Sequence, residues 1–399
     1  MTPPVVALVG PLPPWRGGIA DQDARLLGAM RRLGVEPLVV GFRRMYPKFL
    51  YPGTSAYSEE EKKDFSAEKK NFLEGEEANA PLGAGHAQFR GASLLDGLNP
   101  FSFKRAARRL SLEEISLVVL PWWTSYFAPH VSLFLSTLGA ERPSAVRLLL
   151  CHNVFDHERN PLKSALTRAV LKRADRFVVQ NASSAGEILS ERPDAHVDVV
   201  PHPSEPRAVI PDRAAARARL GVPADVALFL FSGILRPYKG WDVLLEAFAA
   251  ARRELPEAQL VLAGEAWGAA RDVPARAPAG VRLELRYLSE DERALWFAAC
   301  DAVVCPYRHA TGSGIAADAL AFSRPVIGSA VDGLAGVVED GRSGLLVPPG
   351  DAGALAAALV RFVRDGLGPR LSAGAAYRRA FFTPDAHARR VLAAGGMDV

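Results

Sequence analysis

The chain has 399 residues, of which 49% are hydrophobic and 23% charged, and its formal net charge is +4. At roughly 150 residues per domain, this length predicts two or three domains. The composition is typical of a folded globular protein and excludes a disordered chain, a fibre and a bundle of membrane spans. The small positive excess gives no indication of a nucleic-acid partner.

The three cysteines, Cys151, Cys300 and Cys305, form no C-x-x-C pair and lie in or beside apolar runs. We expect buried, reduced thiols without a disulfide framework or a zinc site. The start of the chain has no basic segment, and its apolar run at 5–9 is too short for a signal peptide. These features together predict a cytoplasmic protein.

Predicted strands and helices alternate in the first half of the chain. A buried strand at 5–9, a helix at 19–33 and a second strand at 37–41 form the start of a parallel α/β sheet. The alternation of strands and helices stops near 44–97. There we expect a charged insertion that is a solvated surface segment rather than a lid over a cleft. Further strands are predicted at 117–120, 145–150, 176–179 and 196–200.

A helix that begins near Pro100 has apolar residues at helical spacing and a basic opposite face that includes Lys104 and Arg105. Such a helix can lie on an anionic membrane surface. A solvated helix face is the commoner use of this pattern and is modestly favoured. A peripheral contact with the inner face of the membrane therefore stays open.

A proline-rich segment at 201–206 is typical of a linker, and the alternation of strands and helices restarts after it. The chain is thus predicted to hold two α/β units in tandem, whose ligands would bind beyond the carboxyl ends of the strands. Strands are predicted at 227–231, 259–262, 282–285, 302–304, 325–327 and 344–347, and helices at 241–255, 290–299, 314–322 and 352–365.

Two loops between a strand and a helix have compositions that suit an anion. Gly17 and Gly18 would let the backbone approach a ligand, but alone they equally predict a tight turn. In the loop 233–240, Arg236 and Lys239 provide a planar fork and a point charge that could grip a diphosphate. Two cations at the positive end of a helix dipole favour anion binding over two solvated basic residues.

Two further loops carry polar residues after apolar strands. In 306–318, the small residues around Ser313 could cradle a phosphate or a sugar, and Asp318 could accept hydrogen bonds from a ribose or merely favour the helix dipole. The crowding of polar residues in 149–158 favours a site around His152 over a structural histidine. Neither loop has the spacing of a metal site.

Together, these segments resemble the GT-B glycosyltransferases of family GT4, the retaining enzymes that use nucleotide-sugar donors. The resemblance covers most of the chain and depends on the order and spacing of motifs that are individually weak. The motifs are 10–19 (GPLPPWRGGI), 152–158 (HNVFDHE), 173–179 (RADRFVV), 201–203 (PHP), 233–240 (GILRPYKG), 262–265 (LAGE), 299–301 (ACD), 331–334 (VDGL) and 339–351 (EDGRSGLLVPPGD).

The resemblance implies a GT-B architecture of two Rossmann-like parallel-sheet domains that face each other across a cleft. An N-terminal acceptor domain would span 1–204, a C-terminal donor domain 205–374, and a helix within 375–399 would cross back to the first domain. The implied activity moves a sugar from a UDP-, GDP- or ADP-sugar to a hydroxyl of a glycan or lipid-linked glycan. No metal and no permanently bound cofactor are expected.

The resemblance also implies roles for individual residues. Arg236 and Lys239 would hold the donor diphosphate and neutralise the leaving nucleotide, and His152 would lie beside the transferred sugar. The other expected donor contacts are Gly17, Gly18, Gly233, Glu265, Leu288, Thr311, Ser313, Gly314, Ile315 and Asp318. The expected acceptor contacts are Trp122, Trp123, Asn153, His157 and Glu158, although core packing is the commoner use of such tryptophans.

One loop departs from the family pattern of two glutamates eight residues apart. Asp318 fills the second position, whereas the first falls on Ala310 or Thr311, neither of which is acidic. The carboxylate that usually contacts the donor sugar is thus missing, and 310–314 (ATGSG) resembles a branch of the family with ATQSG there. Two other functions stay open: an epimerase-like enzyme acting on nucleotide sugars, and a degenerate transferase that acts as a binding protein.

Overall fold

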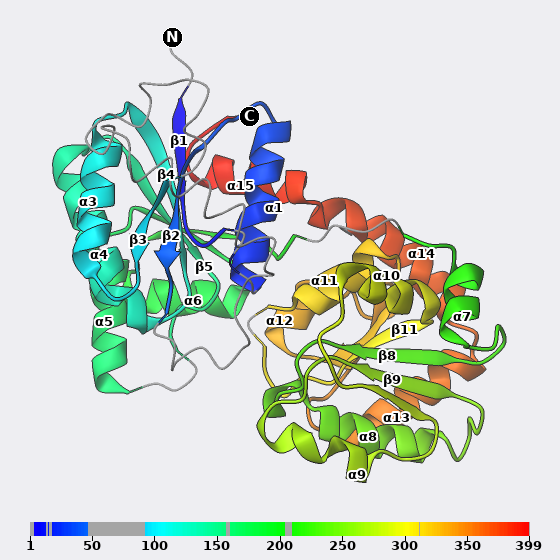
Figure 1. Cartoon of the computed structure of the whole chain (residues 1–399). Helices are drawn as coiled ribbons and strands as arrows, with labels where there is room; N and C mark the ends of the chain where they lie inside the picture. The colour runs from blue at the N-terminus through cyan, green and yellow to red at the C-terminus, as the bar shows by residue number, and fades with distance from the viewer. Residues whose placement is uncertain are drawn as a thin grey trace. The chain divides into compact units, whose positions relative to one another are not determined.

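The computed structural model describes residues 4–12, 15, 18–46, 92–156, 160–203, 210–310 and 312–398. The chain divides into two compact units (Figure 1). Unit 1 is formed by Met1–Val200 together with His387–Val399, and unit 2 by Pro201–Ala386. Most of the insertion expected near 44–97 lies outside the described residues.

Unit 1 contains a seven-stranded parallel sheet with the order β3-β2-β1-β4-β5-β6-β7. Its strands are β1 (Val5–Val9), β2 (Leu38–Arg44), β3 (Ala92–Asp96), β4 (Ile115–Trp122), β5 (Val146–Cys151), β6 (Arg176–Val179) and β7 (His196–Val199). The helices assigned to it are α1 (Gly18–Arg32), α3 (Pro100–Ser111), the 3-10 turn η3 (Ser125–Phe127), α4 (Ala128–Glu141), α5 (Pro161–Leu171), α6 (Ala182–Glu191) and most of α15 (Pro384–Ala394).

Successive residues of β1 enter two different apolar layers, because side chains alternate across a strand. Val9 packs in the layer that contains Phe103 of α3. Leu8 packs in the opposite layer with Leu26 of α1 and Val391 of α15. Helices therefore cover both faces of the sheet (Figure 1), which explains the continuous apolar run of β1.

The short strand β3 was not predicted from the sequence. It pairs in parallel with β2, and Asp96 at its end accepts two hydrogen bonds from the Arg44 guanidinium, at 2.8 and 2.6 Å. Although burial alone would raise the pKa of Asp96, the bonds from Arg44, the Leu98 N–H and Arg43 lower it to about 2. The ion pair with Arg44 therefore fixes this short edge strand beside β2.

The last helix, α15, is part of the core of unit 1. Its Val391 and Leu392 are buried with Val6 and Leu8 of the sheet, and Arg176 donates a hydrogen bond to the carbonyl of Ala394 at 2.9 Å. The segment predicted as one helix within 375–399 is divided among the end of α14 (Gly368–Arg379), a 3-10 turn η6 (Ala380–Phe382) and α15.

Unit 2 contains a six-stranded parallel sheet with the order β10-β9-β8-β11-β12-β13. Its strands are β8 (Leu228–Ser232), β9 (Gln259–Ala263), β10 (Val281–Glu284), β11 (Ala302–Cys305), β12 (Val326–Ser329) and β13 (Gly344–Val347). Its remaining helices are α7 (Arg213–Leu220), the 3-10 turns η4 (Pro237–Lys239) and η5 (Gly268–Asp272), α8 (Trp241–Ala251), α9 (Val273–Arg276), α10 (Glu290–Ala299), α11 (Gly314–Ala321), α12 (Asp332–Ala335) and α13 (Ala352–Arg364).

The core of unit 2 also has two layers. Phe229 and Phe231 of β8 pack in the layer of α8 and α13, whereas Leu228 and Leu230 pack in the layer of α10 and α11 (Figure 1). The three cysteines are buried and free, as expected, and burial raises the pKa of the Cys300 thiol to about 12. No helix in the described ranges is both long and apolar enough to cross a bilayer.

Each sheet has a point where the strand order reverses. In unit 1 the chain runs from β1 outward to β2 and β3 and then returns to β4 on the other side of β1. In unit 2 it runs from β8 to β9 and β10 and returns to β11. Loops on either side of such a point diverge and leave a crevice at the carboxyl ends of the strands. The predicted site residues lie at the carboxyl ends of these four strands and of β5, β9 and β10 in the same sheets, or in the segments that follow.

Candidate functional site

In unit 2, backbone hydrogen bonds join the loop after β8 to the loop after β9. The Gly233 N–H donates to the carbonyl of Ala263 at 2.8 Å, and the Leu235 N–H donates to the carbonyl of Glu265 at 2.9 Å. These bonds extend the β8–β9 ladder beyond the last residues of the strands. The two loops are therefore held to one another by the backbone.

The loop after β11 is fastened to the loop after β8. The Arg308 N–H donates to the carbonyl of Tyr238 at 2.8 Å, and its guanidinium forms a two-point ion pair with Asp242 at 2.9 and 2.8 Å. Gly240 has a φ of +66°, and a Cβ there would lie 2.0 Å from the carbonyl oxygen of Pro306. Glycine thus permits both the turn and the close contact between the loops.

The Lys239 side chain lies close to Gly233, the first residue of the loop after β8. A Cβ on Gly233, whose φ is +100°, would lie 2.8 Å from the Lys239 Nζ and 3.5 Å from the Cδ1 of Ile315. Burial is the largest cause that lowers the pKa of Lys239 to about 8, and the positive charges of Arg236 and Arg293 act in the same direction. Gly233 and Lys239 of the loop 233–240 and Ile315 of the segment 306–318, which were predicted separately, thus meet at one place.

Arg236 is exposed on the same loop, and its guanidinium carbon lies 4.8 Å from the centroid of the Trp267 ring. Within the described ranges, neither Arg236 nor Lys239 has a carboxylate partner. The neighbouring cations differ, because Arg308 pairs with Asp242 and Arg293 pairs with Asp318. Two uncompensated cations therefore stand at the crevice of this sheet.

The N-terminus of α11 forms the other side of this site. The Ser313 side chain caps the helix by accepting a hydrogen bond from the Ala316 N–H at 3.1 Å, and Gly314 is exposed in the first turn. One turn further along, Asp318 accepts a hydrogen bond from Arg293 at 2.6 Å. Thr311 lies outside the described residues.

The remaining predicted donor residues of unit 2 lie on the β9 and β10 sides. Glu265 is half-buried and accepts a hydrogen bond from the Trp267 Nε1–H at 3.0 Å. The side chain of Leu288 is buried in the core, so only its backbone is available to a ligand. No group of three or more His, Cys, Asp or Glu side chains in the described part of the chain could hold a metal ion.

In unit 1, His152 follows β5 and is buried. Its Nδ1 lies 3.2 Å from the Gln180 Nε2, and its backbone N–H donates to the carbonyl of Trp122 at 2.8 Å. With the amide donating, Nδ1 accepts and the ring proton resides on Nε2. Asn153 is half-buried beside it, and Gly18 is exposed at the start of α1. Gly17, His157 and Glu158 lie outside the described residues.

The two predicted acceptor tryptophans differ in exposure. Trp122 is 1% exposed, and its Nε1–H donates to the carbonyl of Val154 at 2.9 Å, so its ring is part of the core. Trp123 is half-buried and donates to the Tyr46 hydroxyl at 2.8 Å. Of the pair, only Trp123 has ring surface that a ligand could touch in this conformation.

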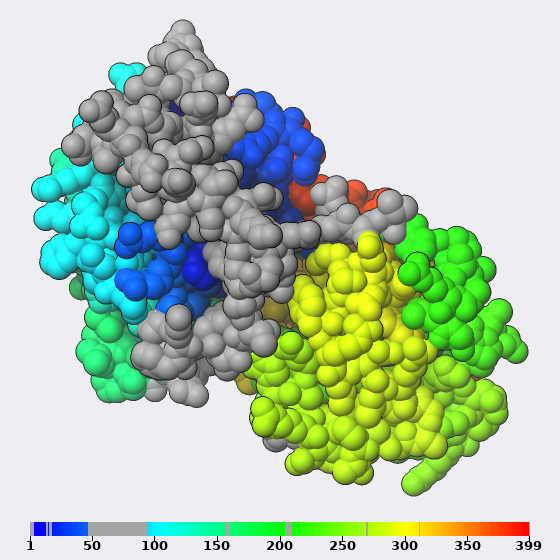
Figure 2. Space-filling model, in the orientation of Figure 1, coloured from blue at the N-terminus to red at the C-terminus, as the bar shows by residue number. Residues whose placement is uncertain are grey.

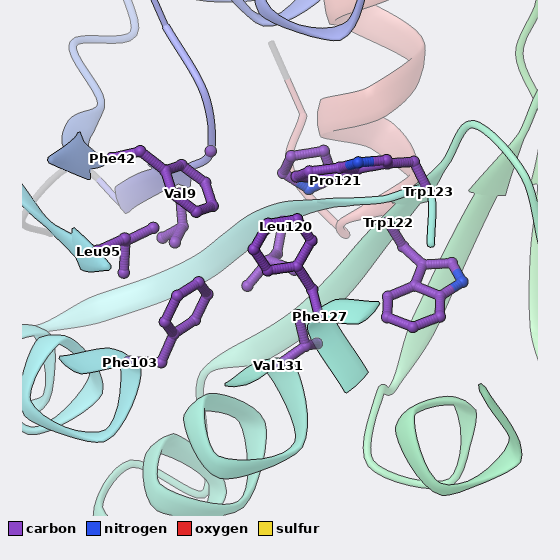
Figure 3. A pocket seen from close by; sticks show the side chains of 11 residues that line it. Val9, Phe42, Leu95, Phe103, Leu120, Pro121, Trp122, Trp123, Phe127 and Val131 are labelled. Atoms are coloured by element: carbon purple, nitrogen blue, oxygen red, sulfur yellow. The ribbon is translucent and has the colours of Figure 1, made fainter. Parts of the chain in front are cut away.

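A small apolar pocket lies beside these tryptophans at the carboxyl edge of the sheet (Figure 3). Phe42, Phe103 and Phe127 converge on it from three different elements. Gly10, directly after β1, and Pro121 of β4 also line it. Its walls are almost wholly aromatic and aliphatic. This edge of unit 1 therefore combines a polar patch at His152 with an apolar recess.

Four residues of the two sites were not predicted from the sequence. Trp267, Tyr307 and Arg293 contact or neighbour the cation pair, and Gln180 orients His152. Tyr307 lies two residues after the buried strand β11, and Trp267 four residues after β9. Their place after strands was a usable signal, but nothing in the sequence pairs them with particular cations.

Residues 227–365 match the family described as glycosyl transferases group 1. A D-inositol 3-phosphate glycosyltransferase from Nocardioides sp. is 35% identical over 246 residues, which cover 56% of this chain and 54% of the relative. A Mycobacterium bovis protein of the same name is 32% identical and covers 57% and 50%. The chain thus spans about half the length of the curated relatives it matches.

Solved structures show a similar fold over nearly the whole chain. Sucrose-phosphate synthase from Thermosynechococcus elongatus has a TM-score of 0.70 with 20% identity and covers 96% of each chain. HepE from Anabaena in complex with UDP has a TM-score of 0.70 with 15% identity and covers 98% of each chain. The expected fold of two Rossmann-like parallel-sheet units, similar to GT-B glycosyltransferases, and the resemblance to family GT4 are both confirmed.

The close packing of Gly240 against Pro306 leads to a stability test. Gly240→Ala should lower the free energy of unfolding by roughly 1–3 kcal/mol or more, because it adds a steric clash to an unfavourable φ. Gly221→Ala is the matched control, since Gly221 has a φ of +67° with open space around its Cβ position. Equal losses in chemical denaturation would show that the loop contact does not matter.

Proposed function

We propose that this chain, which resembles the glycosyl transferases of group 1, is a retaining glycosyltransferase that moves a sugar from a nucleoside-diphosphate donor to an acceptor hydroxyl. The observation that carries the proposal is the pair of cations Arg236 and Lys239 at the strand-order reversal of unit 2, neither of which has a carboxylate partner among the residues that the structure describes. Positive charge held in this way suits an anion, and a diphosphate has the length and charge to meet both side chains.

The proposed chemistry is cleavage of the bond between the donor sugar and the β-phosphate, with retention at the anomeric carbon. Negative charge develops on the β-phosphate as the bond breaks. Arg236 and Lys239 would stabilise this charge, together with N–H groups at the start of α11 near Gly314, as donors placed in advance do in an oxyanion hole. These groups supply the charge stabilisation, so the proposal requires no metal ion.

The identity of the donor is proposed as a UDP-, GDP- or ADP-sugar. HepE from Anabaena has been solved with UDP and with UDP-glucose, and starch synthase IV from Arabidopsis with ADP and acarbose, all with the same fold as this chain. Asp318, held by Arg293, is the proposed acceptor of hydrogen bonds from the ribose. At the position of the missing family glutamate, the Ala310 carbonyl accepts the Gly333 N–H at 2.9 Å.

The acceptor is proposed to be a glycan or a lipid-linked glycan that binds to unit 1. His152, whose Nδ1 contacts Gln180, is the proposed contact with the transferred sugar, with Asn153 and the exposed part of Trp123 beside it.

The central test removes the two cations. Arg236→Ala and Lys239→Ala should each lower the transfer rate about 100- to 1000-fold, because each deletes a group that stabilises the leaving phosphate. Transfer is measured as nucleoside diphosphate released only when acceptor is present, from a panel of UDP-, GDP- and ADP-sugars. Arg253→Ala, an exposed arginine at the end of α8, is the control and should retain the full rate.

The same assay distinguishes the other two functions. Interconversion of two nucleotide sugars without acceptor would instead indicate the epimerase-like enzyme. Nucleotide binding that is unchanged in both alanine variants, with no turnover, would indicate a binding protein that does not use this pair. Either result would contradict the proposed transferase.

Burial of Lys239 predicts a pH dependence of donor binding. Only the ammonium form pairs with a phosphate, and the pKa of this lysine is lowered to about 8. Diphosphate affinity should therefore be full below pH 8 and fall as the pH rises through that value, with uptake of a proton on binding in the alkaline range. Calorimetric titration with a nucleoside diphosphate between pH 6.5 and 9.5, in buffers of different ionisation enthalpy, measures both. Flat affinity without proton uptake would contradict this assignment.

A peripheral membrane contact through α3 is part of the proposal for the acceptor. Phe101 and Leu112 are 62% and 59% exposed, and Arg105 of α3 is exposed as well. Helix α3 forms part of the cyan surface in Figure 2. Apolar and basic side chains on one helix face suit an anionic lipid surface. Lys104 is half-buried on the same helix.

Sedimentation with vesicles tests this contact. The chain should bind phosphatidylglycerol vesicles and not phosphatidylcholine vesicles, and Phe101→Ser with Leu112→Ser should reduce the bound fraction several-fold because two apolar anchors are lost. Tyr377→Ser with Phe381→Ser removes two aromatic side chains of unit 2 that are 72% and 47% exposed, and it should leave binding unchanged. Lack of binding to anionic vesicles would refute the contact.

A further inference from the structure

Each cation of the proposed diphosphate site lies against an aromatic ring. The guanidinium carbon of Arg236 is 4.8 Å from the centroid of Trp267, and the Lys239 Nζ is 6.0 Å from the centroid of Tyr307. Arg293 and Arg308 of the same unit are instead fixed by carboxylates. The two kinds of support differ in one respect that matters for an anion site: a carboxylate neutralises the cation that it orients, and a ring does not.

We infer that Trp267 is a positioning residue for Arg236, an inference that rests on the proposed function. The indole holds the guanidinium through its face and leaves the N–H groups at the edge of the fork to donate to phosphate oxygens. The support is rigid, because the Trp267 N–H bonds to the carbonyl of Leu235 at 3.4 Å and the Leu235 N–H to that of Glu265 at 2.9 Å. The ring and the cation therefore belong to one hydrogen-bonded frame.

The indole has a second contact that protects the positive charge. Its Nε1–H donates to the Glu265 carboxylate at 3.0 Å. Glu265 and Arg236 thus touch the same indole, the carboxylate at its N–H and the guanidinium at its face. Trp267 keeps the acid engaged on itself, and loss of the N–H would release a carboxylate next to the cation that has to meet the diphosphate.

Tyr307 contacts Lys239 in a similar way. However, Tyr307 is buried among the residues of the α10 and α11 layer, and its hydroxyl lies 3.4 Å from that of Ser313. Substitution of Tyr307 would disturb the core. Trp267 is half-buried, so its variants offer the cleaner test.

The experiment measures the affinity of the full chain for the nucleoside diphosphate and the nucleoside monophosphate of the same base by calorimetric titration, with the base that binds best among uracil, guanine and adenine. Trp267→Leu should weaken diphosphate binding about three- to tenfold and leave monophosphate binding nearly unchanged, because the lost ring acts on the group that meets the β-phosphate. In an Arg236→Ala background, Trp267→Leu should have no further effect.

Further variants test the two contacts of the indole independently, the ring face against Arg236 and the N–H bond to Glu265. Trp267→Phe keeps a ring but not the N–H, so diphosphate binding should fall and should recover when Glu265→Gln is added. The same Glu265→Gln change should not restore Trp267→Leu. Arg282→Leu is the control for the loss of an arginine–indole contact elsewhere in unit 2. Arg282 lies on the edge strand β10, and its guanidinium carbon is 4.6 Å from the centroid of the Trp296 ring. This substitution should not alter binding.

Equal weakening of diphosphate and monophosphate binding, or a Trp267→Leu loss that persists without Arg236, would overturn the positioning role and leave the proposed function standing. If none of the three nucleoside diphosphates binds the unaltered chain, the proposed function fails and this inference fails with it. The two failures are therefore distinguishable in one set of titrations.

Discussion

The second unit depends on two like charges that are kept close together and that have no carboxylate partner in the part of the chain that the structure describes. Arg236 and Lys239 stand three residues apart on a short turn before α8, where the helix dipole disfavours cations. Burial and the neighbouring guanidinium groups already act against the charge on Lys239 and lower its pKa. A bound anion would offset the electrostatic cost of holding these two cations close together. The hydrogen bonds that join the surrounding loops keep the pair in place.

The same plan appears in both units. Each sheet reverses its strand order once, and polar residues follow the strands at or next to that point. In unit 2 the loops after β8 and β11 hold the cation pair and the start of α11, which we propose to bind a donor. In unit 1 the loop after β5, the sheet neighbour of β4, holds His152 and Asn153, the proposed contacts with the transferred sugar and the acceptor. The two sheets have similar topology, so the difference between the two proposed binding roles comes from the side chains in the loops.

The sequence predicted the strands that carry the sites because they are short apolar runs bounded by turn residues. It also predicted Arg236, Lys239 and Ser313, since each lies in a loop whose composition is unusual over a few residues. It did not predict β3, because Asp96 holds this edge strand through arginines more than fifty residues away in the chain. For the same reason the pairing of Arg236 with Trp267, of Asp318 with Arg293 and of His152 with Gln180 was beyond reach. The burial of Trp122 beside the more accessible Trp123 also had no sequence signal.

A crystal structure of the chain with a bound nucleoside diphosphate tests the central claim most directly. The account predicts that a phosphate oxygen lies within hydrogen-bond distance of both the Arg236 guanidinium and the Lys239 Nζ, with the indole of Trp267 still against Arg236. Density for the diphosphate elsewhere, with the two cations left unoccupied or turned toward carboxylates, would contradict it.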